Sequence, residues 1–309
     1  MGKGDYSNAK NTISLGSDAP RSKSGGIVVD IGMTDHLVRL DHASLVALAF
    51  VVVIGLPHGA FDGAIARHLG YARTLGGLIK FVTVYLGLAA AAVGFWVWQP
   101  GLALALFLLI SALHFGSGDA TAAGGIARAV QIAAHGSVAV FGISLFHLQQ
   151  VTPLYATLAN GDVMLAVMMT EIFPLFIMPV AALYLIVAIR DAGLRPRLVE
   201  LALLCLSLSV VPPLVGFAVY FCVIHTGRHM RHIWDRVSSR TAPRHIIMQA
   251  VWFTLASWGG GAIMLLWLDS GNISQDLLQV VFIGLAALTV PHMILVDGLF
   301  RRRDVKDAI

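Results

Sequence analysis

Four histidines in this sequence, His58, His114, His225 and His229, have the residue type and the apolar setting of a buried metal site. They lie in the segments LPHGAFD, LHFGSGD and IHTGRH, each beside a long apolar stretch. An imidazole that faces lipid costs free energy with nothing to offset it, so imidazoles at membrane depth indicate a functional site. Imidazole is also the commonest protein ligand for transition metals. We therefore expect these four side chains to converge on one metal ion.

The spacing of His225 and His229 suits chelation from a single helix. Residues four apart on a helix are offset by about 40° and lie one turn apart, so both imidazoles can reach one ion. His232 follows His229 by three residues and offers an equally chelating pair. We favour His225 and His229, because His225 ends the apolar segment YFCVIH, whereas His232 precedes the sequence WDR, which is typical of a membrane interface.

The other two histidines lie at interruptions of apolar segments. His58 stands between Pro57 and Gly59, which free the local backbone and let an imidazole approach an ion. A helix-end histidine that bonds a backbone carbonyl is the alternative for this position. His114 ends the run ALFLLISALHFG, where packing alone does not explain a polar residue. Four such histidines in one membrane domain favour a shared metal over four separate structural roles.

Two carboxylates and one further histidine lie where they could support the ligands. Asp62 follows His58 by about one turn and Asp119 follows His114 by five residues. Each could accept a hydrogen bond that fixes the tautomer of a ligand. The alternative for both is an interfacial position at a helix end. His292, in TVPHMILVD, is a further candidate ligand or a hydrogen-bond partner of one.

The composition indicates that membrane helices position these residues. Of the 309 residues, 57% are hydrophobic and 12% are charged, and the mean hydropathy is +0.80, which soluble domains of this length do not approach. We therefore predict an all-α, polytopic membrane bundle of about 8–9 transmembrane helices, several of them kinked or short. The apolar runs fall at about 42–57, 77–98, 101–115, 126–148, 163–189, 198–211, 214–233, 247–268 and 276–298.

The domain organisation follows from the same pattern. We predict a flexible tail over 1–38, one membrane-embedded catalytic domain over 39–300 and a basic tail over 301–309. If Pro212-Pro213 is a turn between two short spans, the basic clusters fall on one side of the membrane, which gives nine crossings and a cytoplasmic C-terminus. A single span over 198–223 would instead separate His225 from the other ligands. Eight crossings with one re-entrant segment is the remaining alternative.

The ligand set restricts the metal and the substrate. Zinc would be saturated by four imidazoles in a closed tetrahedral site, which would be structural. Iron(II) prefers a higher coordination number and would leave room for dioxygen and a substrate. Walls of Leu, Phe, Val and Trp suit a hydrocarbon-like substrate that arrives from the lipid. Aromatic residues near the ligands could form its tunnel or simply pack the bundle: Phe61, Phe115, Tyr220, Phe221 and Trp258.

These motifs resemble those of the Brp/Blh family of membrane-bound β-carotene 15,15'-dioxygenases. The resemblance rests on LPHGAFD, LHFGSGD, IHTGRH and the late PHM, and it runs from about residue 42 to 298. It implies iron(II)-dependent cleavage of the central double bond of β-carotene by dioxygen, giving two molecules of all-trans-retinal for a microbial rhodopsin. It also implies that His58, His114, His225 and His229 are the iron ligands. We expect a multi-pass protein of the cell (inner) membrane, with the lipid bilayer as its surroundings.

Other functions fit the sequence less well. A membrane desaturase or hydroxylase also acts on lipids through histidines, but it needs HxxHH clusters, and the sequence contains no HH pair. A metal or proton transporter would place carboxylates along its path, whereas Glu171 and Asp191 are isolated near span ends. A rhodopsin is excluded because the late helices contain no lysine for a retinal Schiff base. The net charge of +4 comes mostly from arginines in loops and termini, so no nucleic-acid partner is expected.

Overall fold

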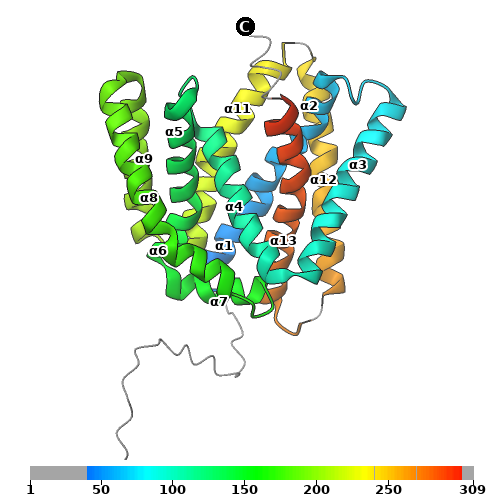
Figure 1. The fold of residues 1–309 in the computed structure, drawn as a ribbon. Coiled ribbons are helices and arrows are strands. Elements are labelled where there is room, and N and C mark those ends of the chain that lie inside the picture. The colour runs from blue at the N-terminus through cyan, green and yellow to red at the C-terminus, as the bar shows by residue number, and fades with distance from the viewer. Residues whose placement is uncertain (1–39, 240, 269, 301–309) are drawn as a thin grey trace, which may run out of the picture. The chain divides into compact units, whose positions relative to one another are not determined.

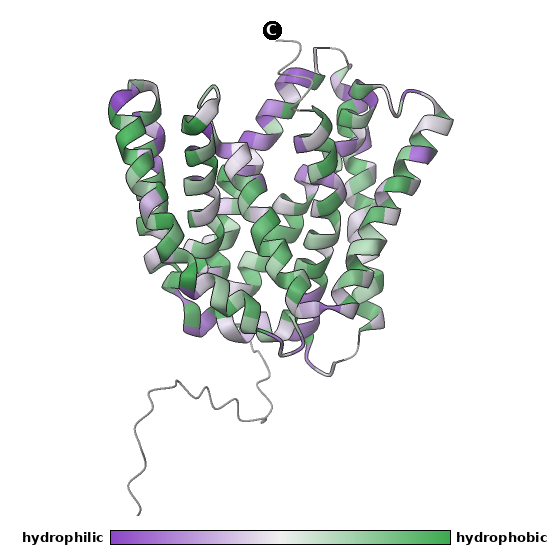
Figure 2. Cartoon of the chain, viewed as in Figure 1, coloured by the Kyte–Doolittle hydropathy of each residue, from purple (hydrophilic) through white to green (hydrophobic). Residues whose placement is uncertain are grey.

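The computed structural model describes residues 40–239, 241–268 and 270–300, and all regular elements in these ranges are helical (Figure 1). The predicted all-α fold is therefore confirmed. The two tails predicted over 1–38 and 301–309 lie outside the described residues. Figure 2 shows that hydrophobic residues cover most of the length of the helices and that hydrophilic residues gather toward their ends.

The elements alternate between α-helices and short segments of 3₁₀- or π-helix, which are labelled η. In chain order they are α1 (His42–Phe50), η1 (Val51–Gly55), η2 (Leu56–Phe61), α2 (Asp62–Leu69), α3 (Leu75–Trp98), α4 (Pro100–Asp119), α5 (Gly125–Ser137), η3 (Val138–Gly142), α6 (Ile143–Phe146), α7 (Leu148–Leu158), α8 (Met164–Arg190), η4 (Ala192–Leu194), α9 (Arg195–Val210), α10 (Pro213–Ala218), η5 (Val219–His225), α11 (Thr226–Val237), α12 (Pro243–Trp267), α13 (Ile273–Met293) and η6 (Ile294–Phe300).

Seven helical stretches of the described chain are long and apolar enough to cross a membrane. They are His42–Leu69, Leu75–Trp98, Pro100–Asp119, Gly125–Phe146, Met164–Arg190, Pro243–Trp267 and Ile273–Phe300. Helix α9 and the run Pro213–Val237 are two further helical stretches that do not reach this criterion. The expected number of about 8–9 spans therefore agrees approximately with the structure.

A turn separates α9 from α10, as the Pro212-Pro213 pair predicts. Helix α9 ends at Val210, and Val211 and Pro212 are both extended, with ψ angles of 136° and 145°. Proline disfavours the helical conformation of the residue before it, so the two adjacent prolines enforce the break. The chain then continues as helix from Pro213 to Val237 and contacts α4 and η2. This turn brings His225 to the same region as His58 and His114.

Two glycines allow α4 and α5 to approach closely. A Cβ atom added at Gly116 would overlap the backbone carbonyl of Ile132, and one added at Gly136 would overlap the carbonyl of Ala112. Small residues at such crossings let membrane helices pack backbone against backbone. Because α4 carries His114, this crossing also sets the position of one predicted ligand.

We expect the substitution Gly136→Ala to destabilise the protein, because backbone atoms cannot move aside as a flexible side chain can. Overpacking of this kind costs about 1–3 kcal/mol. The thermal midpoint of the purified protein in detergent measures the effect. Gly94→Ala in α3 is the matched control, since a Cβ there meets no atom within 4 Å. Equal midpoints for the two variants would contradict the close crossing.

Candidate metal centre

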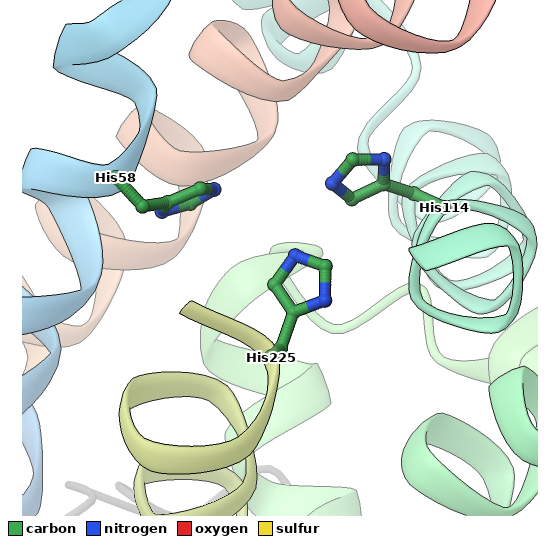
Figure 3. Close-up of side chains that lie close together, drawn as sticks. All are labelled: His58, His114 and His225. Atoms are coloured by element: carbon green, nitrogen blue, oxygen red, sulfur yellow. The ribbon is translucent and has the colours of Figure 1, made fainter. Parts of the chain in front are cut away.

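Five buried histidines from separate parts of the chain meet inside the bundle. His58 comes from η2, His114 from α4, His225 from the end of η5, His229 from α11 and His292 from α13. Figure 3 shows the rings of His58, His114 and His225 directed toward one another. One nitrogen from each of these three rings lies within 4.8 Å of the others, so the three could hold a metal ion.

The remaining two histidines adjoin this trio. The ring centroid of His229 lies 5.5 Å from that of His58 and 5.0 Å from that of His292. The centroid of His292 lies 5.2 Å from that of His58 and 5.1 Å from that of His114. His292, which the sequence left as a candidate ligand or supporting residue, is thus a full member of the cluster.

The histidine pair on one helix lies as its spacing predicts. The rings of His225 and His229 are nearly parallel, with an interplanar angle of 13° and centroids 5.8 Å apart. A π-helical segment, η5, ends at His225, and α11 continues from Thr226. Such segments interrupt α-helices frequently at functional sites.

The backbone around His58 fixes which of its ring nitrogens can bind a metal. Pro57, His58 and Gly59 lie in the 3₁₀ segment η2, and the His58 Nδ1 bonds the carbonyl of Gly55. A carbonyl can only accept, so Nδ1 carries the proton and the lone pair of the neutral imidazole is on Nε2. His58 therefore bonds a backbone carbonyl, which was the alternative to metal binding at this position. The bond uses only Nδ1, so Nε2 can still bind a metal. The two interpretations of His58 are therefore compatible.

Two carboxylates orient two further imidazoles in the same way. His114 Nδ1 lies 2.8 Å from Asp297 Oδ2, and His292 Nδ1 lies 2.8 Å from Asp62 Oδ1. An ionised carboxylate only accepts, so both Nδ1 atoms donate and both lone pairs are on Nε2. Tyr85 in turn donates to Asp62 Oδ2 at 2.8 Å. Metal-binding histidines commonly have this carboxylate partner.

Neither of the two candidate carboxylates, Asp62 and Asp119, bonds the histidine that precedes it in its own segment. Asp62 bonds His292 and not His58, because four residues of a 3₁₀ helix, at three per turn, place it about 120° around the axis from His58. Asp119 does not bond His114, because five residues along α4 turn it about 140° away from that histidine.

Asp119 instead ties three elements together. It accepts hydrogen bonds from Tyr220 at 2.8 Å and from Arg228 at 2.9 Å, and Arg228 also pairs with Glu200. Because Tyr220 and Arg228 flank His225 in the sequence, this network fixes η5 and α11 against the end of α4. Asp119 thus supports the site through the helices and not through a ligand.

Asp297 is the site residue that sequence reasoning missed. It lies in the segment TVPHMILVD, five residues after His292, and belongs to the π-helix η6. Its partner, His114, is 183 residues away along the chain. The carboxylate in an apolar segment was a usable signal, but no local spacing rule connects it to His114.

The structure places His232 outside the cluster. Its side chain is exposed, and its ring centroid lies 6.1 Å from that of Phe300. Of the two histidine pairs considered, the one that lies within the cluster is His225 with His229.

The five aromatic residues that could form the substrate tunnel lie in different surroundings. Phe115 contacts His225 with ring centroids 4.6 Å apart, and Phe221 contacts His58 at 5.1 Å. Tyr220 is fully buried and bonds Asp119, and Phe61 packs in a separate apolar cluster. Trp258 is 37% exposed and donates to the carbonyl of Val52. Of the five, only Phe115 lines either of the two cavities described next.

Two cavities adjoin the cluster. The first, here called the histidine cavity, has a volume of about 40 Å³ and is lined by Leu56, His58, Gly59, Ala60, Tyr85, Phe253, Ser257, Leu285, Leu288, Thr289 and His292. The second, here called the apolar cavity, has a volume of about 90 Å³. Its lining includes Phe107, Phe115, Ala139, Tyr155, Phe217 and Phe282.

The donor set fits a transition metal. The converging atoms are imidazole nitrogens, which suit iron, copper, nickel or zinc better than magnesium or calcium. His229 Nε2 is buried and has no hydrogen-bond partner among the described residues. A buried polar atom without a partner is costly, and a bound metal ion would satisfy it.

Comparison with known proteins gives two matches. A family model described as "Beta-carotene 15,15'-dioxygenase" matches residues 49–300. A curated protein with the same name, from the uncultured marine bacterium 66A03, is 38% identical over 257 residues, which cover 82% of this chain and 93% of the relative. No solved structure matches the chain.

Proposed function

The chain belongs to the β-carotene 15,15'-dioxygenase family of oxidoreductases, and we propose that it uses iron(II) and dioxygen to cleave the central double bond of β-carotene into two molecules of all-trans-retinal. The observation that carries this proposal is the buried cluster of five histidines beside a small apolar cavity. Cleavage of one alkene by one dioxygen gives two carbonyl groups, so the reaction is balanced without an external reductant.

His58, His114, His225 and His229 would hold the metal, and we add His292 as a fifth nitrogen donor. A fifth imidazole exceeds the four that saturate a tetrahedral zinc site, and it therefore favours a metal of higher coordination number such as iron(II). When bound, iron(II) would supply the one-electron chemistry that dioxygen needs in order to react with a closed-shell alkene.

The protein's own residues contribute orientation and exclusion of water. Gly55, Asp297 and Asp62 each hold an imidazole with its Nε2 directed away from the hydrogen-bonded side. The neighbouring rings of Phe115 and Phe221 present hydrocarbon surface beside the imidazoles. Such a site can hold a polyene in one orientation, and the reaction needs no protein acid or base.

The apolar helices support a location in the cell's inner membrane, where β-carotene is dissolved and where retinal could pass to a microbial rhodopsin. Coexpression in a bacterial host that makes β-carotene tests the activity. We expect the orange colour to disappear and retinal to accumulate. Persistent β-carotene with no retinal, in cells whose membranes contain the protein, would contradict the proposal.

We expect the substitution Asp297→Asn to weaken metal binding, because the neutral amide polarises His114 less than a carboxylate does. Loss of such a partner typically costs about 10- to 100-fold in metal affinity. Anaerobic titration of the metal-free protein with iron(II), or with Co(II) as a spectroscopic probe, measures the affinity. Glu171→Gln, at an exposed position of α8, should leave it unchanged. Equal affinities in the two variants would exclude this role for Asp297.

A further inference from the structure

We propose that Trp258 positions His58 for metal binding, because its indole N–H takes the place of the backbone N–H that Pro57 lacks. Trp258 is a positioning residue in this assignment, since it acts through the backbone of η1 and not as a ligand. The inference rests on the metal centre of the proposed function. It adds to that centre a residue of α12, which is 206 residues away from its partner along the chain.

Pro57 leaves one backbone carbonyl of η1 without its helical donor. The backbone N–H of Leu56 donates to the carbonyl of Val51, five residues earlier, as in a π-helix. The next bond of this pattern would join the carbonyl of Val52 to the N–H of residue 57, and proline has no N–H. An unpaired carbonyl at membrane depth costs free energy, because no water is there to bond it. The Val52 carbonyl therefore needs a donor from another part of the protein.

The indole N–H of Trp258 needs an acceptor for the same reason. Trp258 lies near the middle of the apolar span α12, and its side chain is partly exposed. Tryptophans of membrane proteins gather at the interface, where the indole N–H meets water or headgroups. In the middle of a span the lipid offers no such acceptor. Trp258 Nε1 lies 2.9 Å from the carbonyl oxygen of Val52, so each of the two groups satisfies the other.

The segment that Trp258 fixes also orients His58. Val52 and Gly55 both belong to η1, and the Gly55 carbonyl accepts the hydrogen bond from His58 Nδ1. A rotation of η1 about its axis would turn this carbonyl and draw the imidazole with it. His58 Nε2 must stay directed toward the other rings of the cluster in order to bind a metal. The bond from Trp258 therefore sets the orientation of a ligand through the carbonyl of Gly55.

Helix α12 packs directly against the segment that carries His58. It contacts η2 and α2, and its Phe253 and Ser257 line the histidine cavity together with His58. Phe253 also lies against Gly63, where an added Cβ atom would overlap its ring. Apolar contacts of this kind set the distance between the two helices, but they have little directional preference. The hydrogen bond from Trp258 is directional, so it sets how η1 is turned relative to α12.

The first test titrates the metal-free protein with Co(II) as a spectroscopic probe. Trp258→Phe keeps an aromatic ring and removes the N–H, and we expect the Co(II) affinity to fall by about tenfold, as on loss of a group that orients a ligand. The visible spectrum of the Co(II)-loaded variant should also change, because it reports the ligand geometry. Trp252→Phe is the matched control on the same helix, with a side chain that is 67% exposed, and it should match the parent. Parent affinity and a parent spectrum for Trp258→Phe would overturn the proposal, even if its thermal midpoint falls.

A double-mutant cycle tests the pairing of Trp258 with Pro57 without any metal. Pro57→Ala supplies an N–H at residue 57, which can donate to the Val52 carbonyl in place of the indole. In this background we expect Trp258→Phe to lower the thermal midpoint by about half or less of its effect in the parent. If Trp258→Phe alone does not fold, the double variant should.

Equal losses in both backgrounds, or a double variant that is also unfolded, would show that Trp258 does not replace the missing N–H. A parent protein that binds no Co(II) would overturn the proposed metal centre and with it the positioning role. The thermal midpoints of the cycle would still show whether the bond between Trp258 and Val52 has the assigned role in the backbone. Failure of the inference and failure of the proposed function are therefore distinguishable.

Discussion

Replacement of His225 by alanine is expected to remove most of the bound iron and to abolish β-carotene cleavage. The ring of His225 contacts three other imidazoles of the cluster, with centroids 5.7 Å from His58, 5.0 Å from His114 and 5.8 Å from His229. It also contributes one of the three nitrogens that lie within 4.8 Å of one another. Removal of this side chain leaves the remaining imidazoles facing a gap that a small residue cannot fill.

The measurement is the iron content per chain after anaerobic reconstitution, together with retinal formation. His232→Ala is the matched control, because it removes an exposed imidazole from the same helical run. This control should retain both iron and activity. A His225→Ala protein with full iron content and full activity would exclude His225 as a ligand.

Removal of His292 should have the second largest effect. We expect His292→Ala to lose iron, because this imidazole lies within 5.2 Å of three other rings of the cluster, centroid to centroid. Asp62 orients it, and Tyr85 donates to Asp62 in turn. Since His292 lines the histidine cavity, the variant leaves a space that a small molecule can enter.

Free imidazole provides the decisive readout for His292. Added imidazole should restore part of the iron affinity of His292→Ala, as measured by Co(II) or iron(II) titration. Thr289→Ala, one turn earlier on the same face of α13, controls for the enlarged cavity and should bind iron as the parent does. If His292→Ala binds iron with the parent affinity, His292 does not contribute a fifth nitrogen.

The sequence predicted those features of the site that depend on local chemistry. Apolar segments locate the spans, and the prolines at 212 and 213 place the turn that returns His225 to the cluster. The i, i+4 rule places the rings of His225 and His229 side by side. Each of these features follows from the steric preferences of a few adjacent residues.

The carboxylate partners could not be predicted in this way. Asp297 and His114 are 183 residues apart, and Asp62 and His292 are 230 residues apart, so their pairing depends on the packing of the whole bundle. A spacing of one turn between His58 and Asp62 holds for a regular α-helix, whereas the structure has a 3₁₀ segment there and a π-helical segment around Asp297. Non-standard helical turns direct side chains to other faces.

The central claim is tested most directly by reconstitution of the purified protein with iron(II) under anaerobic conditions, followed by addition of β-carotene and then oxygen. The account predicts about one iron per chain and two molecules of retinal for each β-carotene consumed, with no reductant added. Unchanged β-carotene, or cleavage at a bond other than the central one by a fully iron-loaded protein, would contradict it.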